Sequence, residues 1–524
     1  MRIATQTVSM VLLGFGLLLG LVASTHASDE LTASSSAVAA NPVAIVVVEP
    51  TILRAGANDK AQQQTALHAG DLLEVRGERQ DFLQVYDHRH ERAGFVRRNQ
   101  VRTIGQRAED APALLAIVQF LQDTQGAEAL GIAYVAAYLH AAPANTIDGQ
   151  PFAALGKMAE RLARRASQNR SAAGDEVLAA QLDVAAAYGV VMNSFERDQR
   201  LQLCYDGEAF RRVLALDAPP ATKAEAALAL TRHDCVNPSM TSLEREGYDH
   251  WRLTVLDRVD LAPLADYLKN RLRMRRAGVL SAIAFADSKR NAPQPEMIAN
   301  AQHALDALAS INKAELTQDD QSTYTDAAIR VAAVRWAATL APSNPYPVPA
   351  VGPKKNAGGL LSNLSLDISQ GQPGETCVAL RTASGANQTT VEPLIQRCTY
   401  AKVWPQSAVT NENGSQVALA VQPLASWREL WVFQRGATGW TLQVLPPATE
   451  TPELGYVEFA GWVPGGEFML VAREARTGNK TLRNFAQIRL DTLDTERQAA
   501  DPEALSVFYR WQDPLWKRQT LSLR

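Results

Sequence analysis

The chain has few of the residues and motifs on which catalysis and nucleic-acid binding usually depend. Its 524 residues include only eight histidines and four cysteines, and its formal net charge is -3. A charge so close to neutral offers no concentrated basic surface for nucleic acid. The sequence contains no G-x-x-x-x-G-K-[ST] phosphate loop, no G-x-S-x-G nucleophile elbow and no H-E-x-x-H zinc motif. We therefore expect a non-catalytic protein without a cofactor.

The scarce cysteines form two pairs that are close in the sequence, Cys204 with Cys235 and Cys377 with Cys398. Neither pair has the C-x-x-C spacing of redox sites. The last histidine is His303, so a thiolate in the second pair would have no imidazole base in its own region. In an oxidising compartment we expect each pair to form a disulfide within its own domain, although other connectivities remain open.

Long apolar runs are absent beyond the N-terminus, because no later segment approaches the roughly 18 apolar residues that span a bilayer. Residues 11–23 (VLLGFGLLLGLVA) are too short for this and lie between Arg2 and the small-residue site Thr25-His26-Ala27. This arrangement is typical of a secretory signal peptide. We predict a signal peptide over residues 1–27, a flexible spacer over 28–42, and a periplasmic protein without a transmembrane segment after cleavage.

The next region, residues 43–105, has short β-branched and aromatic runs at 43–48, 72–75, 82–86 and 94–96, separated by turn-prone stretches. These residues resemble the bacterial SH3 domain family. The family's L-x-V-R-x-G-P-S segment appears as TILRAGAN at 51–58, its central hairpin as LHAGDLLEV at 67–75, and its G-W-x-x-V and G-W-V as DFLQV at 81–85 and GFV at 94–96. The resemblance implies a small barrel in which aromatic side chains fill the interior or line a peptide groove. The groove candidates are Phe82, Tyr86 and Phe95.

Residues 108–341 are rich in alanine, with apolar residues at helical spacing. We expect an all-helical domain, and the candidate helices are 111–125, 127–141, 151–167, 175–195, 223–232, 261–289, 296–311 and 324–340. The L-G-x-x-Y pattern at 130–134 is similar to tetratricopeptide helices, but no 34-residue period persists. An irregular helical array is therefore expected.

A proline- and glycine-rich linker is predicted at 342–359, followed by a β-rich domain at 360–524 that holds seven of the nine tryptophans. Candidate strands are 416–421, 427–434, 439–445, 467–474 and 485–490. Residues 456–472 are similar to the blades of bacterial β-propellers. Too few such units fit for a closed propeller, so a sandwich or a partial propeller is expected.

Two histidines, His88 and His90, flank Arg89 and precede Glu91 in a predicted hairpin loop, which is either a solvated loop or a zinc site. We favour the solvated loop, because no second ligand cluster supports a metal.

The sequence as a whole predicts a multidomain α+β protein that acts as a binding or scaffold module of the cell envelope. Peptidoglycan peptides or other envelope proteins are the expected partners. A cell-wall hydrolase with an unfamiliar active site and a structural subunit of an envelope complex are the alternatives.

Overall fold

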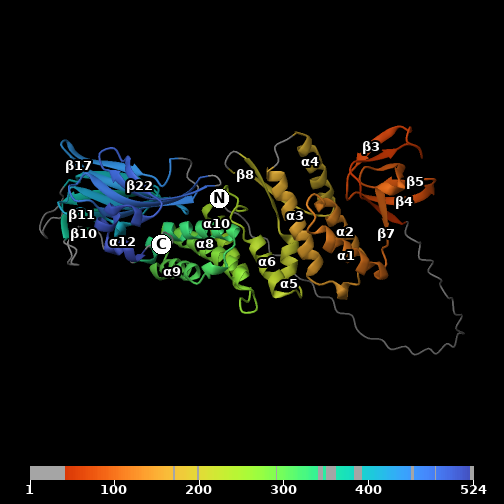
Figure 1. The fold of residues 1–524 in the computed structure, drawn as a ribbon, viewed down its shortest axis with the longest axis horizontal. Coiled ribbons are helices and arrows are strands. Elements are labelled where there is room, and N and C mark those ends of the chain that lie inside the picture. Colours follow the sequence, from red (N-terminus) through yellow and green to blue (C-terminus); the bar gives the residue numbers. More distant parts are fainter. Residues whose placement is uncertain are drawn as a thin grey trace, which may run out of the picture. The chain divides into compact units, whose positions relative to one another are not determined.

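Helices and mainly antiparallel sheets alternate along the chain (Figure 1), in agreement with the predicted mixed class. The computed structural model describes residues 42–168, 172–197, 200–290, 292–339, 346–349, 361–382, 392–449, 454–477 and 480–519. The predicted signal peptide and all but one residue of the predicted spacer lie outside these ranges. Within the ranges, no helix is both long and apolar enough to cross a membrane.

The N-terminal sheet has seven strands in the order β3-β2-β6-β5-β4-β1-β7. They are β1 (Val43–Val46), β2 (Thr51–Arg54), β3 (Gln63–Leu67), β4 (Leu72–Arg79), β5 (Phe82–Asp87), β6 (Arg92–Arg97) and β7 (Val101–Ile104). The four predicted strands coincide with β1, β4, β5 and β6. Alternate side chains of these strands point to one side and form an aliphatic core that includes Leu53, Leu73, Val85 and Val96.

Ten α-helices follow, interrupted by one hairpin. They are α1 (Ala111–Leu121), α2 (Glu128–Ala141), α3 (Gln150–Gln168), α4 (Ala172–Ala187), α5 (Glu208–Ala215), α6 (Pro220–Leu230), α7 (Ser242–Asp257), α8 (Asp266–Arg290), α9 (Gln294–Ala309) and α10 (Gln318–Val334). The hairpin consists of β8 (Met192–Arg197) and β9 (Arg200–Tyr205). Each of the eight predicted helices overlaps one of these helices.

The prediction of an all-helical region with a helix over 175–195 was wrong beyond Ala187. Gly189 has a φ of +80°, the left-handed conformation that commonly ends a helix, and β8 begins three residues later. Helix α7 was not predicted, although it carries a local signal. Its N-cap, Thr241, accepts a hydrogen bond from the backbone N–H of Glu244, whose carboxylate accepts one from the N–H of Thr241.

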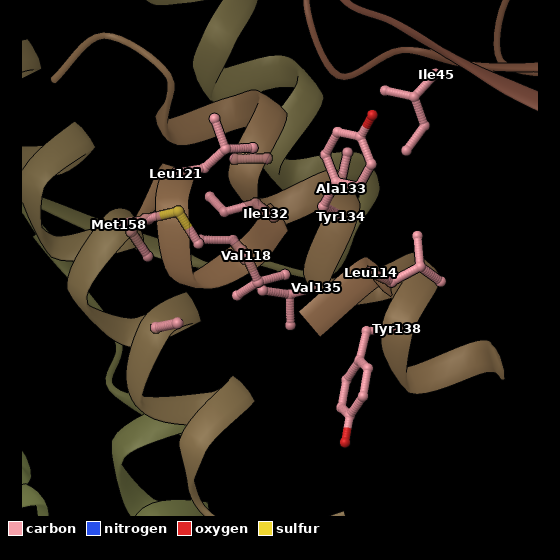
Figure 2. Close-up of a cluster of buried hydrophobic side chains, with 14 of the residues drawn as sticks. Ile45, Leu114, Val118, Leu121, Ile132, Ala133, Tyr134, Val135, Tyr138 and Met158 are labelled. Atoms are coloured by element: carbon pink, nitrogen blue, oxygen red, sulfur yellow. The ribbon is translucent and has the colours of Figure 1, made fainter. Parts of the chain in front are cut away.

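The N-terminal sheet shares a hydrophobic cluster with the first helices. Figure 2 shows Ile45 of β1 in the same cluster as Leu114 of α1 and Tyr134 of α2. Next to this cluster, the hydroxyl of Tyr188 donates a 2.7 Å hydrogen bond to the carbonyl of Gly70. The sheet and the helices are therefore joined by a common core and not only by the chain between them.

At Gly70 the N-terminal sheet lies very close to helices α2 and α4. The φ of this glycine is +103°, and a Cβ added there would lie 2.8 Å from Cγ1 of Val184 and 2.9 Å from the carbonyl oxygen of Ala129. We expect Gly70→Ala to lower the free energy of unfolding by about 2–4 kcal/mol, from backbone strain together with overpacking. Gly126 is the control, because its φ is +89° and a Cβ there meets nothing within 4 Å. Thermal unfolding followed by circular dichroism should show a smaller effect for Gly126→Ala, and equal effects would contradict the steric argument.

The C-terminal region contains two sheets and two short helices. The four-stranded sheet comprises β10 (Tyr346–Pro349), β11 (Leu361–Gln370), β12 (Thr376–Thr382) and β13 (Ile395–Thr399). The larger sheet comprises β14 (Lys402–Val403), β15 (Val409–Thr410), β16 (Gln416–Leu424), β17 (Trp427–Gly436), β18 (Gly439–Leu445), β19 (Leu454–Trp462), β20 (Phe468–Thr477), β21 (Lys480–Arg489) and β22 (Thr495–Ala499). The helices are α11 (Ser506–Trp511) and α12 (Pro514–Gln519). All five predicted strands coincide with strands of the larger sheet.

Side chains of the two C-terminal sheets meet in one hydrophobic cluster, in which Leu366 and Leu380 pack with Leu419 and Phe433. The structure also corrects the predicted linker, because its described part, residues 346–349, forms strand β10. Proline lacks a backbone donor but is tolerated on an edge strand, which is the position of β10 in its sheet.

Candidate binding site

The three predicted groove residues lie on one face of the N-terminal sheet, directed away from its aliphatic core. In β5, Leu83 and Val85 point into the core, so Phe82 and Tyr86 point outward. Phe95 of β6 is paired in register with Gln84, which lies between these two rings. The structure therefore brings the three aromatic rings together on what we call the outer face, defined by Phe82, Tyr86 and Phe95.

Guanidinium groups cover two of the three rings. Arg97 lies over Phe82 with its Cζ 5.1 Å from the ring centroid, and Arg76 lies 4.0 Å above Tyr86. Tyr86 is half-buried and Phe82 is only 5% exposed. Cation–π contacts contribute about 0.5–1 kcal/mol at exposed sites and up to about 2 kcal/mol where the pair is desolvated. Among the described residues no cation covers Phe95, which is half-buried. Phe95 is thus the uncovered ring in the middle of the outer face.

Both covering arginines are held by carboxylates. Arg76 donates to Glu74 at 3.2 Å, and Nε of Arg97 donates to Asp59 at 2.8 Å. The Arg97 guanidinium lowers the pKa of Asp59 below its usual value. Arg54 pairs in register with Phe95. One of its guanidinium N–H groups donates to the carbonyl of Ala61 at 3.3 Å, and Arg54 forms no ion pair with a described residue. The outer face can therefore offer both apolar contact and a guanidinium donor to a ligand.

Sequence reasoning found the three aromatic residues but missed the arginines beside them. The missed signal was strand alternation, because Arg97 is two residues from Phe95 and shares its side of β6. Arg76 could not be placed in this way, because the register of β4 shifts between Val75 and Gly77.

The histidines near the β5–β6 turn do not form a common metal site. Nε2 of His88 lies 2.6 Å from Glu74, whereas Nδ1 of His90 lies 2.6 Å from Asp87. Asp87 also accepts from the backbone N–H groups of this turn, which explains its burial. Each imidazole therefore contacts a different carboxylate, Glu74 for His88 and Asp87 for His90.

The cysteines pair as the sequence analysis predicted. Cys204 is bonded to Cys235, with a Cα–Cα distance of 5.7 Å, and Cys377 is bonded to Cys398. With both bonds formed no cysteine is free, so the chain offers no thiol for nucleophilic attack or for thiolate ligation. Glu375 lies close to the second pair, but a disulfide leaves that group without the thiolates that a soft metal would require.

Searches of protein families, curated proteins and solved structures yield no match to the chain.

Proposed function

We propose that this chain is an exported, non-catalytic binding protein of the bacterial cell envelope, and that its N-terminal sheet is an SH3-like barrel with a ligand site on the outer face. The observation that carries the proposal is the row of three outward aromatic rings with arginines beside it. In such a site the uncovered ring of Phe95 gives flat apolar contact, and the guanidinium groups beside it give directional hydrogen bonds.

Cell-wall stem peptides fit these properties, because they combine short apolar side chains with several carboxylates. A guanidinium binds a carboxylate with two parallel hydrogen bonds, and Arg54 has no carboxylate partner among the described residues. The exported location follows from the predicted signal peptide. It is also supported by the two disulfides, which persist in oxidising compartments.

The test is calorimetric titration of the purified protein with a peptidoglycan tetrapeptide. We expect binding that weakens about tenfold in Phe95→Ala, because this change removes the central uncovered ring. Arg76→Gln should weaken binding while leaving the fold intact, since this side chain is exposed. Phe120→Ala is the matched control, because Phe120 is 73% exposed on α1, and it should bind as the wild type does.

Unchanged affinity in both Phe95→Ala and Arg76→Gln would refute the assignment of the outer face. Release of soluble fragments from peptidoglycan by the protein would refute the non-catalytic part of the proposal.

A further inference from the structure

A cavity of about 580 Å³ lies between the β8–β9 hairpin and helices α5, α6 and α7, far along the chain from the outer face. Its volume is in the range of small-molecule sites, about 300–1,000 Å³. The Cys204–Cys235 disulfide forms part of its wall. Since the hairpin ends at Tyr205 and α7 begins only at Ser242, the cavity exists only in the folded chain.

The wall that carries the hairpin is fixed by two kinds of bond. The disulfide attaches β9 to the loop after α6. Arg197 of β8 donates hydrogen bonds to the carbonyls of Asp234 and Val236 in that loop, each at 3.0 Å. A site held in this way is largely pre-formed, which reduces the entropy lost when a ligand binds.

Five aromatic residues are part of the cavity lining, namely Phe195, Tyr205, Phe210, Tyr248 and Trp251. Tyr248 and Trp251, one helical turn apart on α7, are stacked with their centroids 5.3 Å apart. Across the cavity, Tyr205 and Phe210 make an edge-to-face contact at 6.0 Å. The cavity therefore presents broad aromatic surfaces to a ligand.

The charged side chains that line the cavity neutralise one another. Arg232 donates to Glu160 at 2.8 Å, and Arg211 donates to Asp206 at 2.9 Å. Two arginines and two carboxylates leave no excess charge in the lining. A phosphate, a nucleotide or a strongly acidic ligand would gain no net attraction here, so the cavity favours an uncharged ligand.

Several polar hydrogens of the aromatic residues are available at the same time. Neither the indole N–H of Trp251 nor the hydroxyl of Tyr248 has a hydrogen-bond partner among the described residues. Neither of these polar atoms is fully buried, so both can bond to a ligand. The hydroxyl of Tyr205 accepts from the N–H of Ala209, which leaves its own proton free to donate. Burial raises the pKa of Tyr205 to about 12, so this proton is retained at neutral pH.

We propose that this cavity binds a neutral carbohydrate. A sugar ring has apolar C–H faces that pack on aromatic rings and hydroxyl groups at its edge that accept from N–H and O–H donors, which is the combination that Trp251, Tyr248 and Tyr205 offer. The ligand is a neutral glycan in either case, whether its source is an N-acetylated wall glycan or a plain glucan.

Calorimetric titration of the purified protein with chitotriose and with cellotriose tests the proposal and separates the two sources. We expect at least one sugar to bind, and Trp251→Ala to weaken that binding about tenfold or more, since tryptophan is enriched among the residues that dominate binding energy. Trp251→Phe keeps the ring stacked on Tyr248 but lacks the indole donor, so an intermediate loss is expected. This variant also keeps the test valid if Trp251→Ala fails to fold. Phe120→Ala is the matched control and should leave sugar binding unchanged.

The sugar site and the outer face are independent. Phe95→Ala should retain sugar binding, so failure of the peptide titration and failure of the sugar titration are distinguishable. Absence of binding to both sugars at several millimolar would overturn the proposal. Sugar affinities that are unchanged in both Trp251 variants would also overturn it, because the sugar would then bind elsewhere.

Discussion

Replacing Glu458 with glutamine is expected to lower the free energy of unfolding of the C-terminal sheet by about 3–5 kcal/mol, because it leaves a buried guanidinium without a counter-charge. Glu458 of β19 accepts a 2.9 Å hydrogen bond from Arg428 of β17 and also pairs with Arg335, which directly follows α10. Arg428 is fully buried and Glu458 is 3% exposed. Glutamine has nearly the same shape but no charge.

The same network joins the helices to the larger C-terminal sheet. Arg428 donates to the carbonyl of Ala332 at 2.7 Å, close to the C-terminal end of α10. Carbonyls at this end lack helical partners and carry the negative end of the helix dipole, so a cation is favoured there. Burial lowers the pKa of Arg428 to about 10, which still leaves the guanidinium charged at neutral pH, so it needs a counter-charge. Loss of Glu458 should therefore loosen both the sheet and its contact with α10.

Urea unfolding followed by tryptophan fluorescence measures this effect, because seven of the nine tryptophans belong to the C-terminal region. Asp123→Asn is the control, since Asp123 pairs with Lys157 at 2.5 Å on the surface, with both side chains more than half exposed. Exposed ion pairs typically contribute no more than about 1 kcal/mol. If Glu458→Gln shifts the midpoint no more than Asp123→Asn does, the buried network is not a major stabilising contact.

The second large effect is expected for the Cys204–Cys235 disulfide. The double replacement Cys204→Ser and Cys235→Ser should destabilise the helical region by about 3–4 kcal/mol, the loop-closure value for a bridge that spans about 30 residues. The hairpin β8–β9 should also be held less firmly to the α6–α7 loop, because the hydrogen bonds between the two among the described residues all come from Arg197. Ellipticity at 222 nm during urea unfolding measures the change.

The other disulfide provides the comparison. Cys377→Ser with Cys398→Ser breaks a bond between two residues that already face each other in the β12–β13 ladder. Its effect should appear in the tryptophan-detected transition of the C-terminal region and not in the helical one. The Cys204–Cys235 bond does not stabilise the helical region as expected if both double variants change the same transition. The same conclusion follows if Cys204→Ser with Cys235→Ser leaves the urea midpoint unchanged.

Local pattern was enough to predict most of the elements, and the family resemblance named the aromatic residues of the outer face. Helical spacing of apolar residues predicted α2, α3 and α9 nearly residue by residue. The family resemblance named Phe82 and Tyr86 as groove residues, and the structure has both on the same side of β5 because alternate residues of a strand share a face. These predictions succeed because spacing and alternation depend on backbone geometry over a few residues.

The hairpin β8–β9, the edge strand β10 and the buried pair of Arg428 with Glu458 could not be predicted in this way. The disulfide that anchors the hairpin and the Arg428–Glu458 pair each join residues 30 or more positions apart. The partner of β10 lies beyond a proline-rich stretch that is typical of a linker. Arg428 also appears in the sequence as an ordinary charged residue, since nothing beside it signals burial.

By itself, the sequence determined where most of the helices and strands form and which cysteines pair, and the family resemblance named three aromatic residues of the N-terminal sheet. Only the tertiary structure decided that the hairpin and α7 enclose a cavity, that arginines cover the outer face, and that helices and sheets share buried contacts. The physical reason is that secondary structure follows backbone preferences summed over adjacent residues. Burial and charge pairing depend instead on which distant segments the folded chain brings into contact.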